Sequence, residues 1–413
     1  EHEEAEQVLH RLEAVRGAPY LPGRDPKLVC MRHTLGELEM VWKPFIFYLG
    51  ALMLQRLAEV ALRSRGFRLH HTAGLDYWHL PRETNEVAEG KIGAGKPQRA
   101  YSDPIVLMHG VGGLTPYVPF CFSVAAKHAC DILVPCFPSC SIRVPTLASP
   151  PPMPTAELVA AIELMVVATT TGVGAGPGPC QLADPEQSSN ASAASTRAAH
   201  PIAGSATRIE HVQALLSDEA SPPSQATFVA HSMGTAFLAA LLRARPGLAS
   251  SVLFVDPVCF LLYRRDVLYN FLYRKPALRR SWYRPSKWFN LALHRLLTRE
   301  PCMQCCFRRD FWWSQYLLHP WDVPCDAAVL LSGHDAIVNA RDVQRYLSEQ
   351  EAGRKRNLAA NAPIGDRQLR VEMHERRSHG WLMAMPHIRR GVLEVLASLR
   401  QLATTRRYAA RSS

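Results

Sequence analysis

Residues 226–242 read Ala-Thr-Phe-Val-Ala-His-Ser-Met-Gly-Thr-Ala-Phe-Leu-Ala-Ala-Leu-Leu. The apolar run before Ser232 predicts a buried strand, and the apolar residues after it predict a helix. The two elements join within about two residues, so the neighbours of the serine must be small. Such a turn strains the serine backbone and places its hydroxyl beside the unpaired N–H groups of the helix. The stretch Ala230–Gly234, in which His231 precedes the serine and Gly234 ends the motif, therefore predicts a nucleophile elbow. On its own the pattern also fits an ordinary strand–helix turn.

Short apolar runs on both sides of this turn predict further strands, separated by helical sequence. We expect strands at Phe67–His71, Asp76–Leu80, Pro104–Met108, Asp131–Pro135, Ala226–Ala230, Ser251–Val255, Ala327–Ser332 and Leu369–Met373. Most of them lack polar alternation, which indicates burial on both faces. The last strand does alternate, as expected near the edge of a sheet. Strands that alternate with helices predict an α/β fold with a mostly parallel, doubly wound sheet.

Two polar residues that follow later strands complete a candidate catalytic site. A serine hydroxyl needs an adjacent base, and the base needs a carboxylate that orients it. Asp335 follows the strand 327–332, and His379 follows the last strand, so both should lie at the same edge of the sheet as Ser232. The chain order Ser, Asp, His is the one expected for a hydrolase elbow. The alternatives are a rival acid and two competing bases: Asp256, His374 and His387.

A glycine-rich loop follows the strand that ends at Met108. It contains His109, Gly110, Val111, Gly112 and Gly113. Glycines let backbone N–H groups turn toward a substrate oxygen, and we expect the N–H groups of Val111 and Met233 to form an oxyanion hole. A phosphate-binding turn is the alternative, but the G-x-G-x-x-G spacing and a Lys-Ser/Thr pair are absent. We expect a structural role for His109.

The pattern divides the chain into five segments. They are an N-terminal helical segment at 1–66, a first part of the core at 67–257 with a flexible insertion at 172–206, a helical cap at 258–324, a second part of the core at 325–400, and a basic tail at 401–413. The cap is predicted because its many aromatic residues make it too apolar for a simple loop. Because the chain begins at Glu1 rather than methionine, we expect it to be a fragment or a processed form.

Residues 35–65 predict an apolar helix. Its most apolar part is residues 44–54. This part is shorter than the roughly 20 residues of a confident membrane span. Trp42 and Lys43 precede it, and arginines follow it, as in helices that lie in a membrane interface. Packing on the protein core is the alternative. The sequence leaves open whether residues 41–62 span a membrane or lie on it.

Composition limits the partners and cofactors. The net charge is +11 over 413 residues, with basic residues concentrated at 263–309 and in the tail. This charge fits an anionic membrane surface as a partner. An ordinary solvated surface is the alternative. No nucleic-acid-binding motif is present, so we expect no nucleic acid partner.

The cysteines give no sign of a metal site. The chain has 11 cysteines without a regular framework. Such a set suits free thiols inside the cell. Cys302, Cys305 and Cys306 have no second pair at ligand spacing, so we expect packed thiols and no metal. No motif predicts a cofactor.

Together, the elbow, the acid, the histidine and the glycine-rich loop resemble the α/β-hydrolase superfamily over about residues 105–387. The resemblance implies eight strands, a cap between strands six and seven, Ser232 as nucleophile, His379 as base and Asp335 as acid. Residues 256–262 and 269–276 look like a poorly characterised eukaryotic branch found in fungi and algae. One departure is Ala230, where the first elbow glycine is usual.

These parts predict a serine hydrolase acting on a carboxylic ester, with a small-molecule or lipid ester as substrate. The aromatic cap favours a hydrophobic acyl chain. The serine at the elbow argues against an epoxide or haloalkane hydrolase, because the enzymes of these classes in the family it resembles use an aspartate at that position. Two alternatives remain: a non-catalytic binding protein of the same fold, and an acyltransferase that uses the same serine. The acyltransferase motif H-x-x-x-x-D is absent near His379, and we attribute its match at His71 and Asp76 to chance. We expect an intracellular protein; association with a membrane or organelle is left open.

Overall fold

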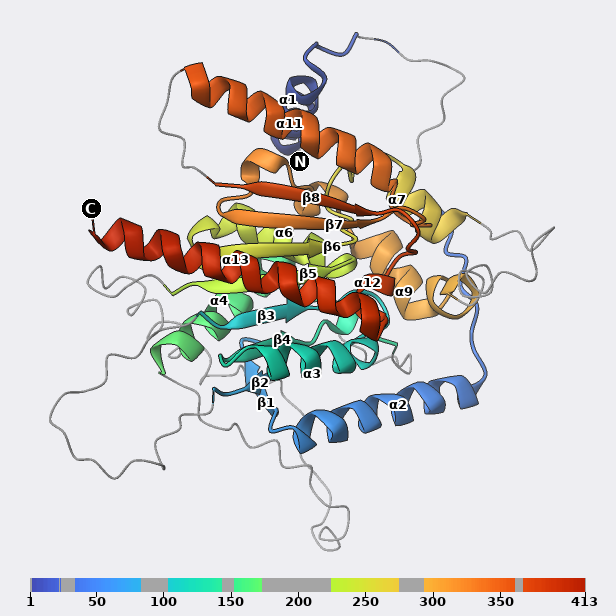
Figure 1. Ribbon diagram of the computed structural model, residues 1–413. Coiled ribbons are helices and arrows are strands. Elements are labelled where there is room, and N and C mark those ends of the chain that lie inside the picture. Colours follow the sequence, from blue (N-terminus) through green and yellow to red (C-terminus); the bar gives the residue numbers. More distant parts are fainter. Residues whose placement is uncertain are drawn as a thin grey trace, which may run out of the picture.

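The computed structural model describes residues 2–21, 23, 34–82, 103–142, 152–172, 224–274, 293–360 and 367–412. Its centre is a sheet in the order β1-β2-β4-β3-β5-β6-β7-β8 (Figure 1). The strands are β1 Arg68–Thr72, β2 Leu75–Leu80, β3 Ile105–Met108, β4 Ile132–Pro135, β5 Ala226–His231, β6 Ala249–Val255, β7 Asp326–Ser332 and β8 Leu369–His374. β1 and β2 pair antiparallel with their neighbours, and the other pairs are parallel. The predicted α/β fold with a mostly parallel sheet is confirmed.

The burial of the strands follows from their sequences. Every residue of β3, β4, β5 and β7 is buried. Such burial is expected for apolar runs covered on both faces. β8 is the last strand of the sheet and is only partly buried, which agrees with its alternating sequence. The carboxyl ends of the parallel strands point the same way, so the loops after β3, β5, β7 and β8 meet at one edge.

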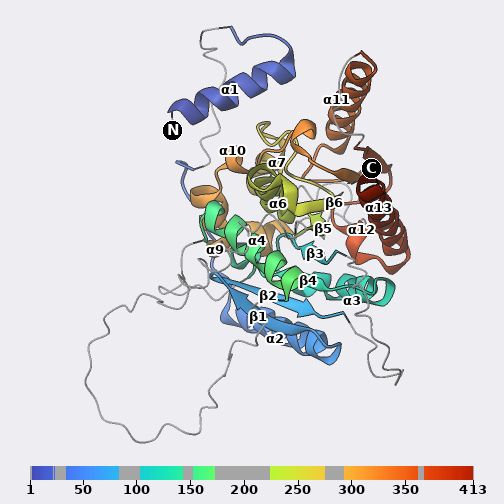
Figure 2. The ribbon, with the colours of Figure 1, turned by 90° about the vertical axis from the view of Figure 1, so that its left-hand side faces the viewer.

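Helices cover both faces of the sheet (Figures 1 and 2). The first face carries α3 Val118–Lys127 and α13 Pro386–Ser412, which pack with the buried side chains of β3, β4 and β6 in one hydrophobic cluster. The second face carries α4 Thr155–Thr171, α6 Met233–Ala244 and the start of α11 Ala340–Ala360 in a second cluster. The sheet therefore holds Ser232 between two hydrophobic layers.

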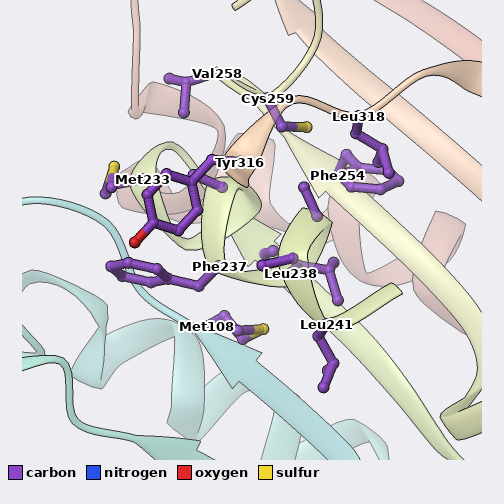
Figure 3. Packing of buried hydrophobic residues seen from close by; sticks show 14 of the residues in the cluster. Met108, Met233, Phe237, Leu238, Leu241, Phe254, Val258, Cys259, Tyr316 and Leu318 are labelled. Carbon is purple, nitrogen blue, oxygen red and sulfur yellow. The ribbon is translucent and has the colours of Figure 1, made fainter. Parts of the chain in front are cut away.

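In its described residues, the insertion between β6 and β7 forms short helical turns. Its described elements are α7 Asp266–Leu268, η4 Tyr269–Tyr273, η5 Leu293–Thr298, α9 Pro301–Cys305, η6 Cys306–Asp310, α10 Trp313–Tyr316 and η7 Pro320–Asp322. Figure 1 shows α7 and α9 beyond the carboxyl ends of the strands. Tyr316 packs edge-on against Phe237 of α6, with ring centroids 5.9 Å apart (Figure 3). The apolar residues of this insertion are thus part of the core on the second face.

The remaining described elements are α1 His2–Arg16, α2 Phe45–Ser64, η1 Thr115–Tyr117, η2 Pro138–Cys140, η3 Pro246–Leu248 and α12 Trp381–Ala384. The apolar helix expected over 35–65 begins only at Phe45, because Pro44 has an extended backbone with ψ of 146°. A proline also disfavours a helical conformation in the residue before it.

Two other expectations about segments differ from the structure or lie outside it. Residues 401–413 are not a separate tail, because α13 continues without a break to Ser412. Arg406 and Arg407 of this helix form ion pairs with Asp326 and Asp103, which hold it against the sheet. Of the insertion expected at 172–206, residues 173–206 lie outside the described residues.

Candidate active site

Ser232 lies in the turn between β5 and α6 with an unusual backbone conformation. Its φ is 52° and its ψ is −122°. Non-glycine residues rarely adopt this region. The turn is held from both sides: Ser232 N–H donates to the Val255 carbonyl, and Thr235 donates to the Ser232 carbonyl through its N–H and its hydroxyl. Such strain persists only where the surrounding structure enforces it, and it is common at functional sites.

The small residues of the turn are required by close backbone approaches. A Cβ atom at Gly234 would lie 2.3 Å from the Met108 carbonyl oxygen, so no larger residue fits there. A Cβ atom at Gly110 would lie 2.9 Å from Ser232 Cβ. The glycine-rich loop after β3 is therefore packed directly against the elbow. Ala230, which replaces the usual glycine, is fully buried within β5, and its methyl group is accommodated in the core.

The structure brings together Ser232, His379 and Asp335, which are far apart in the sequence. His379 Nε2 lies 2.8 Å from Ser232 Oγ, and His379 Nδ1 lies 2.6 Å from Asp335 Oδ2. In the neutral tautomer that suits both contacts, Nδ1–H donates to the carboxylate and Nε2 accepts from the serine hydroxyl. This is the arrangement of a nucleophile, a base and an orienting acid.

Asp335 is fixed by the turn that follows β7. Its Oδ1 accepts hydrogen bonds from the N–H groups of Ile337 and Val338, which leaves Oδ2 for the imidazole of His379. The side chain is 1 % exposed. A buried carboxylate held by two backbone donors keeps a fixed direction, as a residue that orients an imidazole must.

Asp256, the rival acid, is also buried at this edge but has different partners. Its Oδ1 accepts from Ser332 N–H and its Oδ2 from Gly380 N–H. Burial alone would raise the pKa of Asp256, but the neighbouring His231 and His379 and the Gly380 N–H lower it below its usual value. Asp256 thus holds the loop that carries His379, whereas Asp335 accepts the hydrogen bond from the imidazole.

The competing histidines lie elsewhere. His387 is an exposed residue near the start of α13, and His374 ends β8. His71 and Asp76, the pair with H-x-x-x-x-D spacing, face each other across the β1–β2 hairpin 2.8 Å apart. This hairpin is at the opposite end of the strand order from β7 and β8. Within the described part of the chain, His379 is the histidine that is hydrogen-bonded to the Ser232 hydroxyl.

The electrostatics around His379 predict a pH dependence. Burial disfavours the charged imidazolium, but the charge and the hydrogen bond of Asp335 outweigh it and raise the pKa of His379 to about 9. Only the neutral imidazole can accept the serine proton. We therefore expect kcat/KM for a hydrolysis in which His379 is the base to rise with pH until His379 is deprotonated, and then to level off. Steady-state rates corrected for spontaneous hydrolysis check this; a profile that falls as the pH rises toward that value would contradict His379 as the base.

The glycine-rich loop has the features expected of an oxyanion hole. Among the described residues, the N–H groups of Val111 and Met233 have no hydrogen-bond acceptor, whereas Gly112 N–H donates to the Cys140 carbonyl. Met233 is the first residue of α6. Its N–H is therefore one of the free donors at a helix N-terminus. Gly112 and Gly113 have φ values of 102° and 75°. Glycine adopts these values without strain. The two predicted donors remain free for a substrate oxygen.

His109 has the structural environment predicted for it. It is buried, its Nδ1–H donates to the Gly110 carbonyl, and its Nε2 accepts from Phe137 N–H. Burial lowers the pKa of His109 to about 4, which keeps the ring neutral. Both ring nitrogens are occupied, so this ring supports the loop.

Tyr117 also belongs to the site, although the sequence did not predict a role for it. Its hydroxyl accepts the N–H of Gly110 at 2.9 Å and donates to His231 Nδ1 at 2.6 Å. His231 Nε2 in turn lies 3.8 Å from Asp256 Oδ2. This chain of polar groups links the glycine-rich loop to the loop of His379. No motif signals this role, because Tyr117 is seven residues beyond Gly110 and contacts it only through the fold.

One group in the described part of the chain has ligand atoms spaced as in a metal site: Asp256, Asp335 and His379, all within 4.8 Å of one another. The carboxylate oxygens already accept the hydrogen bonds described above, so we interpret the group as a hydrogen-bonded set. Cys302, Cys305 and Cys306 lie on α9 and η6 and form no disulfide bonds. Cys305 is exposed, so the expectation of three packed thiols is wrong for this residue.

Comparisons with known proteins agree with this architecture. A family model described as the α/β hydrolase family matches residues 105–389. The chain belongs to the α/β hydrolase family, and this membership supports a hydrolase. Its assignment to a fungal and algal branch stays a prediction. No curated protein sequence matches the chain.

Several solved structures match most of the chain at low sequence identity. Carboxylesterase CesB from Bacillus subtilis is 10 % identical with a TM-score of 0.41, covering 83 % of this chain and 97 % of that one. An esterase of Pyrobaculum calidifontis is 10 % identical with a TM-score of 0.42, covering 96 % of this chain and 97 % of that one. A membrane phospholipase A, described as a bacterial virulence factor, is 12 % identical with a TM-score of 0.39, covering 86 % of this chain and 94 % of that one. These likenesses carry no information on the substrate.

Proposed function

We propose that the protein is a serine hydrolase that cleaves a carboxylic ester through an acyl-enzyme on Ser232. The observation that carries this proposal is the pair of hydrogen bonds made by His379, one with Ser232 Oγ and one with Asp335 Oδ2. An isolated serine hydroxyl is a weak nucleophile, and this arrangement supplies the base that it needs.

The reaction follows from the positions of these groups. Ser232 Oγ attacks the ester carbonyl carbon while His379 Nε2 takes the hydroxyl proton. The negative charge on the carbonyl oxygen is stabilised by the N–H groups of Val111 and Met233. The carbon–oxygen bond to the alcohol then breaks, and the alcohol leaves with the proton from His379. Water then attacks the acyl carbon while His379 takes its proton. The bond from the acyl carbon to Ser232 Oγ breaks, Oγ takes the proton back from His379, and the carboxylic acid is released.

A hydrophobic acyl chain is the substrate class that the surroundings favour. Ser232 is 7 % exposed, so the nucleophile lies beneath other side chains rather than on the open surface. The insertion between β6 and β7 contributes buried aromatic side chains to the core beside α6, among them Phe307, Phe311 and Tyr316. An apolar surrounding of this kind favours an apolar chain over a charged group.

The proposal predicts covalent labelling and a chain-length preference. A fluorophosphonate probe should label the wild-type protein and not Ser232→Ala, because the probe phosphonylates an activated serine. With p-nitrophenyl esters, kcat/KM of the wild type should rise as the acyl chain lengthens, and Ser232→Ala should not hydrolyse any of them. Gel fluorescence and the release of p-nitrophenol give the two readouts.

The same experiment separates the alternatives. Circular dichroism shows whether each protein is folded. A folded wild type that neither labels nor hydrolyses would contradict the proposal and favour a non-catalytic binding protein. Equal labelling of Ser232→Ala would show that the nucleophile is a residue other than Ser232. Formation of a new ester when an alcohol is added would favour an acyltransferase that uses the same serine.

A further inference from the structure

Helix α2 carries an apolar face on the side away from the protein. Tyr48, Ala58 and Leu62 are its buried residues. Residues three or four positions apart share one side of a helix. On the side opposite the buried residues, exposed apolar residues recur at this spacing: Ile46, Leu49, Met53, Leu57 and Val60. Met53 and Leu57 are 60 % and 63 % exposed. A surface helix normally presents polar residues there, so this face requires a covering partner.

The length and composition of α2 do not decide what covers its apolar face. In the described part of the chain, α2 is the one helix long and apolar enough to cross a membrane. Figures 1 and 2 both show it at the β1–β2 end of the molecule, alongside the protein body. The contacts made by the two ends of α2, however, limit the orientations in which the helix can contact a bilayer.

The C-terminal end of α2 is packed on the first face of the sheet. Leu62 and Phe67 are buried in the same hydrophobic cluster as Phe120 and Val124 of α3. Phe67 N–H donates to the Leu62 carbonyl, and β1 begins at the next residue. This end of the helix therefore belongs to the folded core.

The N-terminal end is bound to the insertion between β6 and β7. The segment before the helix, residues 34–44, is here called the strap. Val41 N–H donates to the Arg299 carbonyl, the Lys43 ammonium donates to the Arg295 carbonyl, and Arg299 pairs with Glu39 at 2.6 Å. Arg309 donates to the carbonyls of Thr34 and Gly36, both at 2.9 Å. The strap thus joins α2 to the cap segment at 295–309.

Both ends of α2 therefore rest on one folded body, which is incompatible with a span. The helix has 20 residues. A helix of this size is about 30 Å long, roughly the thickness of the hydrocarbon layer, and a span would place its ends on opposite sides of that layer. Here the two ends contact parts of the same sheet and insertion. The helix can only meet a bilayer lengthwise, with its outer face toward the acyl chains.

The charges around the helix suit anionic headgroups. Residues 43–68 contain five basic residues and one acidic residue: Lys43, Arg56, Arg63, Arg65, Arg68 and Glu59. Arg56 and Arg63 are exposed and lie along one flank of the apolar face. Trp42, just before the helix, is 65 % exposed. Tryptophan favours the boundary between water and lipid. An apolar stripe with basic flanks and an interfacial tryptophan is typical of helices that lie in a membrane surface.

We propose that α2 is a bilayer-docking helix that inserts lengthwise into one anionic leaflet, with the strap holding the cap at the membrane surface. The exposed apolar face, the two anchored ends and the basic flanks carry this proposal. It does not depend on the proposed esterase activity, since binding to lipid can be measured without any substrate.

The test is flotation of the full chain with lipid vesicles. The wild type should float with vesicles of phosphatidylcholine and phosphatidylglycerol, and less with phosphatidylcholine alone. The double variant Met53→Ser, Leu57→Ser should partition at least about tenfold more weakly, because it removes two large apolar side chains from the face. The matched control Leu9→Ser, Leu21→Ser changes two exposed leucines outside α2 and should float like the wild type.

Further measurements distinguish this arrangement from a membrane span and from a second copy of the chain bound to the apolar face. Alkaline carbonate should release the bound wild type; protein that stays in the vesicles would show a span and overturn the lengthwise geometry. Thermal melting should show that both double variants fold. Absence of flotation in the wild type, or equal flotation of both variants, would overturn the proposal. So would a dimer in lipid-free solution that the Met53, Leu57 variant loses, since a second copy would then cover the face.

Discussion

Replacement of His379 by alanine is expected to lower kcat for ester hydrolysis by about a millionfold. The imidazole is the only group hydrogen-bonded to Ser232 Oγ among the contacts of the described residues, at 2.8 Å. Without it, the serine proton has no acceptor during the attack and the leaving alcohol has no donor. The residual rate should come from the N–H groups of Val111 and Met233 and from substrate binding. Single-turnover kinetics with a p-nitrophenyl ester measure the loss.

The matched control for this variant is His387→Ala. His387 is exposed on α13, so its replacement should leave kcat within the error of the assay. Fluorophosphonate labelling should fall in parallel with kcat for His379→Ala and stay unchanged for His387→Ala. A His379→Ala variant that keeps more than a small fraction of the wild-type rate would place the base elsewhere.

Replacement of Asp335 by asparagine is expected to lower kcat by about ten-thousandfold. The asparagine amide can donate to His379 Nδ1, which favours the tautomer with the proton on Nε2. That tautomer cannot accept the proton of Ser232. The loss of the carboxylate also removes the group that raises the pKa of His379, so the midpoint of the pH profile should move to lower pH. Steady-state kinetics across pH measure both effects.

Asp256→Asn is the comparison that distinguishes the two buried acids. Asp256 accepts backbone N–H groups from Ser332 and Gly380 through separate oxygens, and asparagine keeps only one of these acceptors. We expect a lower Tm from the unsatisfied donor and a change in kcat of about tenfold. If Asp256→Asn instead lost as much kcat as Asp335→Asn, the acid would be shared between them or misassigned.

The strands were predictable because their sequences are short, apolar and bounded by polar turns. Each of the eight observed strands lies within two residues of its predicted bounds. The helix boundaries were less predictable. Residues 35–44 contain several large apolar side chains, yet Pro44 and the hydrogen bonds of Val41 and Lys43 to the cap keep them out of the helix. The partner of Lys43 is 252 residues away in the sequence, where no local pattern reveals it.

The candidate site also combines residues that the sequence could predict with contacts that it could not. Ser232, Asp335 and His379 could be named because each follows a recognisable strand, and parallel strands bring their carboxyl ends to one edge. Asp335 is preferred to Asp256 through the family resemblance, since the strand pattern alone fits both acids. The choice between them depends on which carboxylate oxygen points at the imidazole, and only the structure supplies that direction. Tyr117 lacked any signal, since its hydroxyl reaches Gly110 and His231 only after folding.

The ion pairs of Arg406 and Arg407 bear on how the protein can be handled. They join the far end of α13 to Asp326, the first residue of β7, and to Asp103, just before β3. Figure 1 shows this end of α13 on the side where the strand arrows begin, away from their tips. A solid support attached at this end of α13 would lie away from the sheet edge that carries Ser232 and His379, so the immobilised protein should keep its activity.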